Sequence, residues 1–182
     1  ENSDVPTSAG ISRTRLTGLG TSGPYGILTG ESISEDIHGN TAVQKSYTDR
    51  TAKTGTQTVT YPDSDTAAVS VTQKGLLISS KGKSGHTVTF DYDTLGRRIS
   101  VTDPRTGTSY TSYNARGQTE SVTDAAGNRT EFIYDAMTGQ KRAEKNAGGK
   151  HTRYEYNARG QITRTWGEAV YPVEYKIGRA HV

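Results

Sequence analysis

The stretch Phe90–Ile99 reads FDYDTLGRRI, and its pattern of Tyr, then Asp or Asn, then Gly three residues later returns three more times along the chain, with one extra residue before the glycine of the third copy. The four motif tyrosines are separated by 21, 21 and 22 residues, and each is followed by Asp or Asn and then by Gly. Self-similarity at a fixed period of this length is typical of a repeat architecture. The motif residues are Tyr92, Asp93, Gly96; Tyr113, Asn114, Gly117; Tyr134, Asp135, Gly139; and Tyr156, Asn157, Gly160.

One repeat unit has the pattern of a β-hairpin. In Thr87–Tyr92 apolar side chains alternate with polar ones, which is strand periodicity. The Asp or Asn after the tyrosine can bond its own backbone further on, and the following Gly accepts a positive φ, so a tight turn is expected. The chain returns through Arg97–Asp103 and meets a second glycine-containing turn. The second arms Thr119–Val122 and Gln140–Ala143 are less regular, because they have little apolar character.

The composition favours an extended β structure over a compact globule. Of 182 residues only 30% are hydrophobic, with 11 Tyr and 21 Gly against 2 Phe and 1 Trp, and the mean hydropathy is −0.75. A compact core of this size needs more apolar area. Disordered chains have few aromatics and high net charge, whereas this chain carries only +3. A lone hairpin is only marginally stable in water. We therefore expect the hairpins to lie side by side in one sheet, with the tyrosines forming a continuous ladder, an arrangement that needs no large apolar core.

The pattern Gly…Tyr-Asp-x-x-Gly-Arg, as in GHTVTFDYDTLGRR (Gly85–Arg98), resembles the YD repeat of the Rhs/YD-repeat family. The resemblance extends to about Tyr175, with Asn in place of Asp in two copies and Gln in place of the Arg after Gly in three. It implies an all-β fold of repeated antiparallel β-hairpins that forms part of a spiralling YD-repeat β-shell. In bacterial members the shell is implied to enclose a C-terminal toxin or effector, and other members are surface-associated or wall-associated.

Three regions are predicted along the chain. Residues 85–175 hold about four YD repeats and the start of a fifth, and residues 1–84 look like degenerate repeats of the same sheet, since Asp36–Gly39 has the motif spacing. Residues 176–182 are predicted to be a non-native tail. Ile177–Val182 resembles the translation of a sequencing-adapter oligonucleotide, and the repeat register fails where it begins. The chain is therefore interpreted as an internal fragment of a longer protein.

No catalytic, cofactor-binding or metal-binding residue is predicted, and the chain is not expected to be an enzyme. The histidines lie far apart and lack metal-ligand spacing. Asp91 and Asp93 form a D-x-D pair that a cation could bind, but Asp93 occupies the turn position, where other copies have Asn. No phosphate-binding glycine loop and no nucleophile elbow occurs.

Two functions remain open from the sequence. The first is a structural β-shell segment of a secreted or cell-surface protein, whose partner is the remainder of its own chain. The second is a surface adhesin or carbohydrate-binding module, in which tyrosines and Trp166 stack on sugars rather than pack along the sheet. Lys and Arg (22) are interleaved with Asp and Glu (19), so nucleic acid is not expected as a partner. No apolar stretch is long enough for a membrane span.

Overall fold

The computed structural model of the protein describes residues 26–35 and 39–175. Within these ranges the structure is all-β, without a helix, as predicted. The turn expected at Asp36–Gly39, apart from its glycine, and the tail expected at residues 176–182 lie outside the described residues. The strands are β1 Ile27–Glu35, β2 Thr41–Asp49, β3 Thr54–Thr60, β4 Ala68–Gln73, β5 Leu76–Lys81, β6 Thr87–Tyr92, β7 Arg98–Asp103, β8 Gly107–Tyr113, β9 Thr119–Thr123, β10 Arg129–Tyr134, β11 Lys141–Lys145, β12 His151–Tyr156, β13 Ile162–Gly167 and β14 Val173–Glu174.

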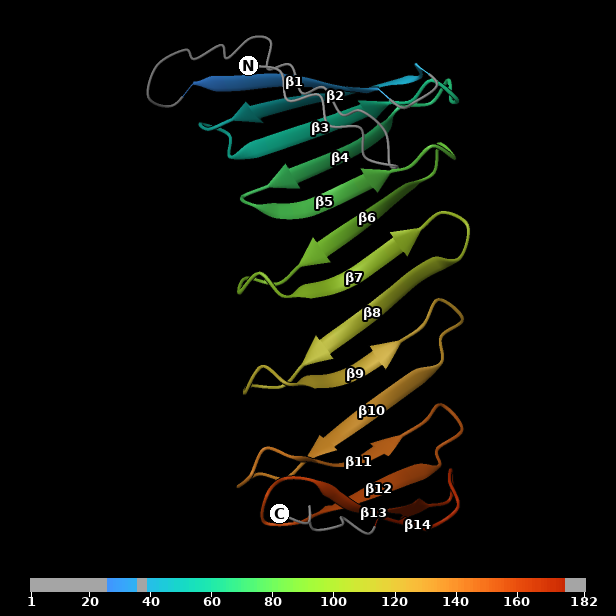
Figure 1. Cartoon of the computed structure of the whole chain (residues 1–182). Helices are drawn as coiled ribbons and strands as arrows, with labels where there is room; N and C mark the ends of the chain where they lie inside the picture. The colour runs from blue at the N-terminus through green and yellow to red at the C-terminus, as the bar shows by residue number, and fades with distance from the viewer. Residues whose placement is uncertain (1–25, 36–38, 176–182) are drawn as a thin grey trace, which may run out of the picture. The chain divides into compact units, whose positions relative to one another are not determined.

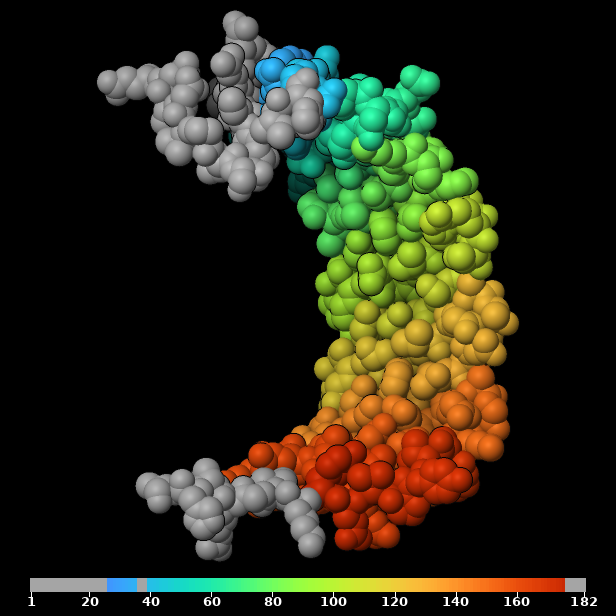
Figure 2. Space-filling view, turned by 45° about the vertical axis from the view of Figure 1, so that its right-hand side comes forward, coloured from blue at the N-terminus to red at the C-terminus, as the bar shows by residue number. Residues whose placement is uncertain are grey.

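The chain divides into two compact units, Glu1–Arg105 and Thr106–Val182. The first contains β1–β7 and the second β8–β14, and within each unit every strand lies antiparallel beside its neighbours in sequence (Figure 1). The colours in each unit accordingly follow one another in chain order (Figure 2). The tyrosine arms β6, β8, β10 and β12 each pair with the strand that follows them, which confirms the predicted hairpins.

A β-bulge occurs at the same place in all four tyrosine hairpins. The register shifts directly before the motif tyrosine, so that two residues of the returning strand lie opposite one of the tyrosine arm. Bulges bend a strand and strengthen its twist, and they re-aim the side chains beside them. Nothing in the alternation pattern of a single arm predicts this bulge. The shifts lie between Asp91 and Tyr92, Ser112 and Tyr113, Ile133 and Tyr134, and Glu155 and Tyr156.

The most buried positions are occupied by small side chains. Ser100, Ser121 and Ala143 are 6%, 4% and 6% exposed, and each lies opposite the residue that precedes a motif tyrosine. The fourth copy has Arg164 at the corresponding position. Most strand side chains are only half-buried, which fits the low apolar content of the sequence. The sheet is therefore stabilised by its backbone hydrogen bonds and by buried small side chains rather than by a thick apolar core.

Candidate functional site

The motif tyrosines bond the main chain of the strand before them. For Tyr92, Tyr134 and Tyr156 the hydroxyl donates to a carbonyl oxygen at 2.7–2.9 Å, and donor and acceptor are 15 residues apart in each pair. This span stays at 15 even though the tyrosines are 21 or 22 residues apart, because the extra residue of the third copy lies in the turn after Tyr134. The pairs are Tyr92 with Leu77, Tyr134 with Thr119, and Tyr156 with Lys141.

The register places the three motif tyrosines of the second unit on one face. Directly paired residues share a face, and residues two apart on a strand do as well. These relations connect Tyr113, Tyr134 and Tyr156. The connecting residues are Thr111, Val122 and Thr130, and then Phe132, Glu144 and Thr152. A strand lies between successive tyrosine arms. The hydroxyls of Tyr134 and Tyr156 therefore reach backbone carbonyls of that intervening strand.

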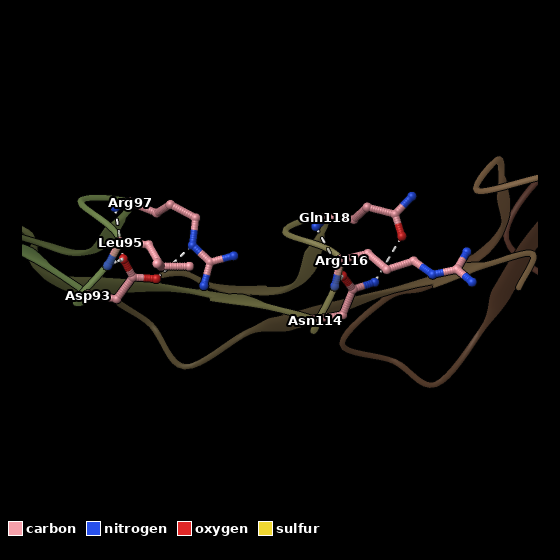
Figure 3. Close-up of polar contacts among 6 residues, drawn as sticks. All are labelled: Asp93, Leu95, Arg97, Asn114, Arg116 and Gln118. Carbon is pink, nitrogen blue, oxygen red and sulfur yellow. Dashed lines mark hydrogen bonds and ion pairs between the residues drawn. The ribbon is translucent and has the colours of Figure 1, made fainter.

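The Asp or Asn after the tyrosine organises a five-residue turn. Asp93 Oδ1 accepts the backbone N–H groups of Leu95 and Arg97, both at 2.9 Å (Figure 3). The backbone carbonyl of Asp93 accepts the N–H of Gly96 at 3.0 Å. Gly96 has φ +78°, which a side-chain-bearing residue adopts only with strain. Asn114 holds the same bonds in the next copy. The amide and the carboxylate serve equally as acceptors here.

In three of the four tyrosine turns, the side chain after the glycine bonds the Asp or Asn that starts the turn. Where the turn begins with Asp93, Arg97 donates its Nε to Oδ2 at 2.7 Å. Where it begins with Asn114, the amide Nδ2 donates to Gln118 Oε1 at 3.0 Å (Figure 3). Asn157 and Gln161 form the same amide pair at 2.9 Å. In these two copies, the replacements of Asp by Asn and of Arg by Gln are thus two halves of one interaction. In the third copy Gln140 follows the glycine although the turn begins with Asp135, and Thr138 donates its backbone N–H and its hydroxyl to Asp135 Oδ1.

The opposite ends of the strands use the same turn. Asp124 Oδ1 accepts the N–H groups of Ala126 and Asn128, and its Oδ2 accepts Asn128 Nδ2 at 2.8 Å. Asn146 repeats the arrangement with Lys150. Figure 1 shows these turns at the ends of β9 and β11, whereas the tyrosine turns follow β8 and β10. The Asx-x-x-Gly spacing at both ends was the signal that could have identified one turn type rather than two.

Gln118 also connects two successive turns. Its Nε2 donates to the carbonyl oxygen of Gly139 at 2.7 Å, which lies 21 residues away in the next tyrosine turn. One side chain therefore closes its own turn through Oε1 and joins the following turn through Nε2. In the sequence Gln118 is only a departure from the Arg of the family pattern, and nothing there predicts this contact.

Asn114→Ala tests the turn. The substitution removes the acceptor of two backbone N–H groups and the donor to Gln118, so we expect a loss of about 1–2 kcal/mol in the free energy of unfolding, measured by urea denaturation. Asn114→Asp together with Gln118→Arg reproduces the pair of the first copy and should retain more of the stability than Asn114→Asp alone. Equal losses in the single and double variants would contradict the matched pairing.

Tyr134→Phe tests the hydroxyl contact. The ring is kept and only the bond to the carbonyl of Thr119 is lost, so we expect a loss of about 1 kcal/mol by urea denaturation. Tyr110→Phe is a suitable control, because Tyr110 is 56% exposed and is not a motif tyrosine. An equal effect of the two substitutions would show that the motif hydroxyl contributes nothing specific.

Hydrogen bonds to the turn carboxylates lower their pKa values. The pKa of Asp93 is lowered chiefly by the backbone N–H of Arg97, and that of Asp135 by the backbone N–H of Thr138. The side-chain amide of Asn128 lowers the pKa of Asp124. The side chain of Arg105 lowers the pKa of Asp103 to about 2. These carboxyl groups are ionised acceptors over the whole neutral range.

The described Asp and His residues that were considered as possible ligands or catalytic groups do not form a common site. Asp91 accepts a hydrogen bond from Ser100, while Asp93 is engaged in its turn. His151 lies beside Glu168, at 3.6 Å between Nδ1 and Oε2. Across the part of the chain that the structure describes, no group of His, Cys, Asp or Glu is arranged to hold a metal ion. Trp166 is covered by the guanidinium of Arg164, 5.2 Å from the ring centre.

A family model described as "RHS Repeat" matches residues 73–108 and 113–140. These residues are RHS repeats. The match confirms the resemblance to the Rhs/YD-repeat family and begins upstream of Gly85, where the resemblance was first placed. It includes the motif residues of the first three RHS repeats, together with the strand pair β6–β7 that carries the first turn.

Two solved structures are similar to this chain over a small part of their own length. The crystal structure of TcdB2-TccC3 is 12% identical with a TM-score of 0.47, over 79% of this chain and 11% of that one. The structure of TcdB2-TccC3-Cdc42 is 14% identical with a TM-score of 0.27, over 76% of this chain and 11% of that one. The RHS-repeat chain thus spans about a tenth of their length. No curated protein matches its sequence, and no helix among its described residues is long and apolar enough to cross a membrane.

Proposed function

We propose that these RHS repeats form a section of a protective β-shell, whose partner is a C-terminal domain of the same protein outside these residues. The observation that carries the proposal is that the recurring polar groups of the repeat bond the protein's own backbone. The motif tyrosine hydroxyls bond carbonyls of the neighbouring strand, and the turn Asp and Asn side chains bond the N–H groups of their own turns. The polar side chains that recur in each repeat therefore hold the sheet together, as a scaffold requires.

The construction of this scaffold favours a role in enclosing another domain. Each added hairpin extends the sheet without a new core, so wall area grows in proportion to chain length. Among residues 26–35 and 39–175, no group of His, Cys, Asp or Glu is arranged to hold a metal ion. A secreted or cell-surface location, with a toxin-like effector as the enclosed domain, completes the proposal, and the chain itself is proposed to have no enzymatic activity.

Protease protection tests enclosure. In a natural chain that contains these repeats followed by a C-terminal domain, we expect that domain to resist a nonspecific protease while the repeats are intact. Gly139→Val should open the wall, because Gly139 has φ +72°, which a β-branched residue does not accept, and should expose the domain to cleavage. Gly148→Ala, at a glycine outside the positive-φ set, is the control.

The outcomes separate enclosure from adhesion. Equal cleavage of the domain in the wild type and in Gly139→Val would contradict enclosure. Saturable binding of the repeats to a neutral glycan array, lost in Trp166→Ala but kept in Gly148→Ala, would instead support the carbohydrate-binding module.

A further inference from the structure

A cleft with unusual backbone and charge lies at the edge of the first unit, between the β2–β3 and β4–β5 turns. It has a volume of about 510 Å³. Three cationic side chains line it, those of Arg50, Lys53 and Lys74, against one carboxylate, that of Asp49. The net charge of the lining is therefore +3 − 1 = +2. Clefts of this size suit small ligands rather than whole protein surfaces.

Both lysines hold a backbone conformation that favours other residues. Lys53 has φ +54° and Lys74 has φ +51°, and within the described ranges they are the non-glycine residues with positive φ. Lys74 and Gly75 form a two-residue loop between the paired Gln73 and Leu76, a turn in which Asn-Gly is the preferred pair. Such conformations cost free energy for an ordinary L-residue and cluster at functional sites.

The two lysines are coupled to each other. The backbone N–H of Lys74 donates to the carbonyl oxygen of Lys53 at 2.6 Å, so the two strained positions belong to one substructure. The Asp49 carboxylate is engaged by the backbone N–H groups of Thr51 and Ala52, at 2.8 and 2.9 Å, and shapes the first turn. Across the described part of the chain, none of the three cations lies within ion-pair distance of a carboxylate, whereas nine other ion pairs of Lys or Arg form elsewhere.

The floor of the cleft is kept open by a missing side chain. Gly55 lies opposite Thr72, and a Cβ at Gly55 would stand 2.7 Å from Thr72 Oγ1. The Thr72 hydroxyl donates to the carbonyl of Gly55 at 3.4 Å across this gap. The planar guanidinium and the two ammonium groups that line the cleft are charged donors of the kind that bind a tetrahedral oxyanion.

We propose that this cleft binds a phosphate-bearing ligand, with Arg50, Lys53 and Lys74 as its charge partners. Lys53 and Lys74 occupy positions where Gly or Asn would be less strained, and their backbones are hydrogen-bonded to each other. Arg50 lines the same cleft as a third cation without an ion-pair partner among the described residues. A multiply charged phosphate supplies the missing negative charge and accepts several hydrogen bonds at once. This binding role is independent of the scaffold role of the repeats.

The experiment uses the complete chain with inorganic pyrophosphate as the probe, observed by calorimetry and ³¹P NMR in low-salt chloride buffer. We expect saturable binding that weakens as salt is added. Lys53→Gly and Lys74→Asn should each weaken it about tenfold or more, because each removes one charge-assisted contact. The same substitutions should raise the thermal midpoint by a few degrees, because they relieve the strained backbone.

The opposite signs of the two effects distinguish a binding site from a structural one. Lys150→Gln, which removes an exposed turn cation of the second unit, is the control and should leave binding unchanged. Sulfate at the same ionic strength separates phosphate recognition from attraction by charge alone, and we expect weaker binding. The proposal is overturned if pyrophosphate does not saturate, if Lys150→Gln weakens binding as much as Lys74→Asn, if sulfate binds equally well, or if both cleft variants lower the thermal midpoint.

Discussion

Gly167→Ala is expected to destabilise the second unit by about 3 kcal/mol or more. Gly167 pairs with Thr152 at the end of β13 and has φ +143°. A Cβ built there would stand 2.0 Å from the carbonyl oxygen of His151 and 3.2 Å from the Cα of Thr152. These are backbone atoms of β12, so they cannot turn aside as a side chain would. The methyl group can be accommodated only by separating the two strands.

Urea denaturation followed by far-ultraviolet circular dichroism measures the loss, and hydrogen exchange locates it. Amide protons of β12 and β13 should exchange faster, whereas those of β8 and β9 should change less. Gly148→Ala is the matched control, because its Cβ would meet only the Asn146 side chain at 3.4 Å and its φ is not positive. We expect that control to stay within about 0.5 kcal/mol of the wild type. Similar unfolding curves for the two variants would contradict the backbone clash.

Acid is expected to unfold the protein over the range in which its turn carboxylates titrate. Because hydrogen bonds lower their folded pKa values below the unfolded ones, the folded state binds fewer protons than the unfolded state between the two values. The stabilisation is therefore complete above pH 4 to 5 and is lost as the pH falls through the folded pKa values, the lowest being that of Asp103, about 2. The other carboxylates with lowered pKa values are Asp63, Asp93, Asp124, Asp135 and Glu168.

The urea midpoint measured between pH 7 and pH 2 tests this expectation. It should be nearly flat above pH 5 and should fall steeply below pH 4. Asp135→Asn is an informative variant, because Asn occupies the same turn position in two other copies and does not titrate. We expect a shallower fall in that variant. A midpoint that is independent of pH down to 2 would show that the turn carboxylates do not contribute to stability.

The tyrosine arms and their turns could be predicted because their signal is local. Alternation within six residues defines β6 and β12, and an Asp or Asn three residues before a Gly defines the turn after them. The second arms were harder to predict, since β9 and β11 bury Ser121 and Ala143, whose small side chains give no apolar alternation. Their position is set by backbone pairing and by the bulge before the tyrosine, which only the assembled hairpin creates.

The cross-repeat contacts could not be predicted for a related reason. The bond from Gln118 to the carbonyl of Gly139 joins residues 21 apart, and a glutamine in a sequence does not specify which carbonyl it will meet. The strained lysines at positions 53 and 74 were equally hidden, because a Lys-Gly or Lys-Thr step reads as an ordinary polar loop. A single unit carries the pattern of its own hairpin, and the arrangement of neighbouring units adds the remaining contacts.

The constant 15-residue span between each hydroxyl and its carbonyl determines where the protein can change length. The additional residue of the third copy lies in the turn between Tyr134 and Lys141, outside the span that ends at Tyr156. Evolution can therefore insert or delete residues in tyrosine turns while the strand spacing is preserved, and can duplicate whole hairpins without altering any existing pair. An insertion within a strand of the span would instead shift its register and detach one tyrosine from its acceptor. Diversity in loop length, and with it the capacity to acquire new surface properties, is thereby directed to the turns at the ends of the strands.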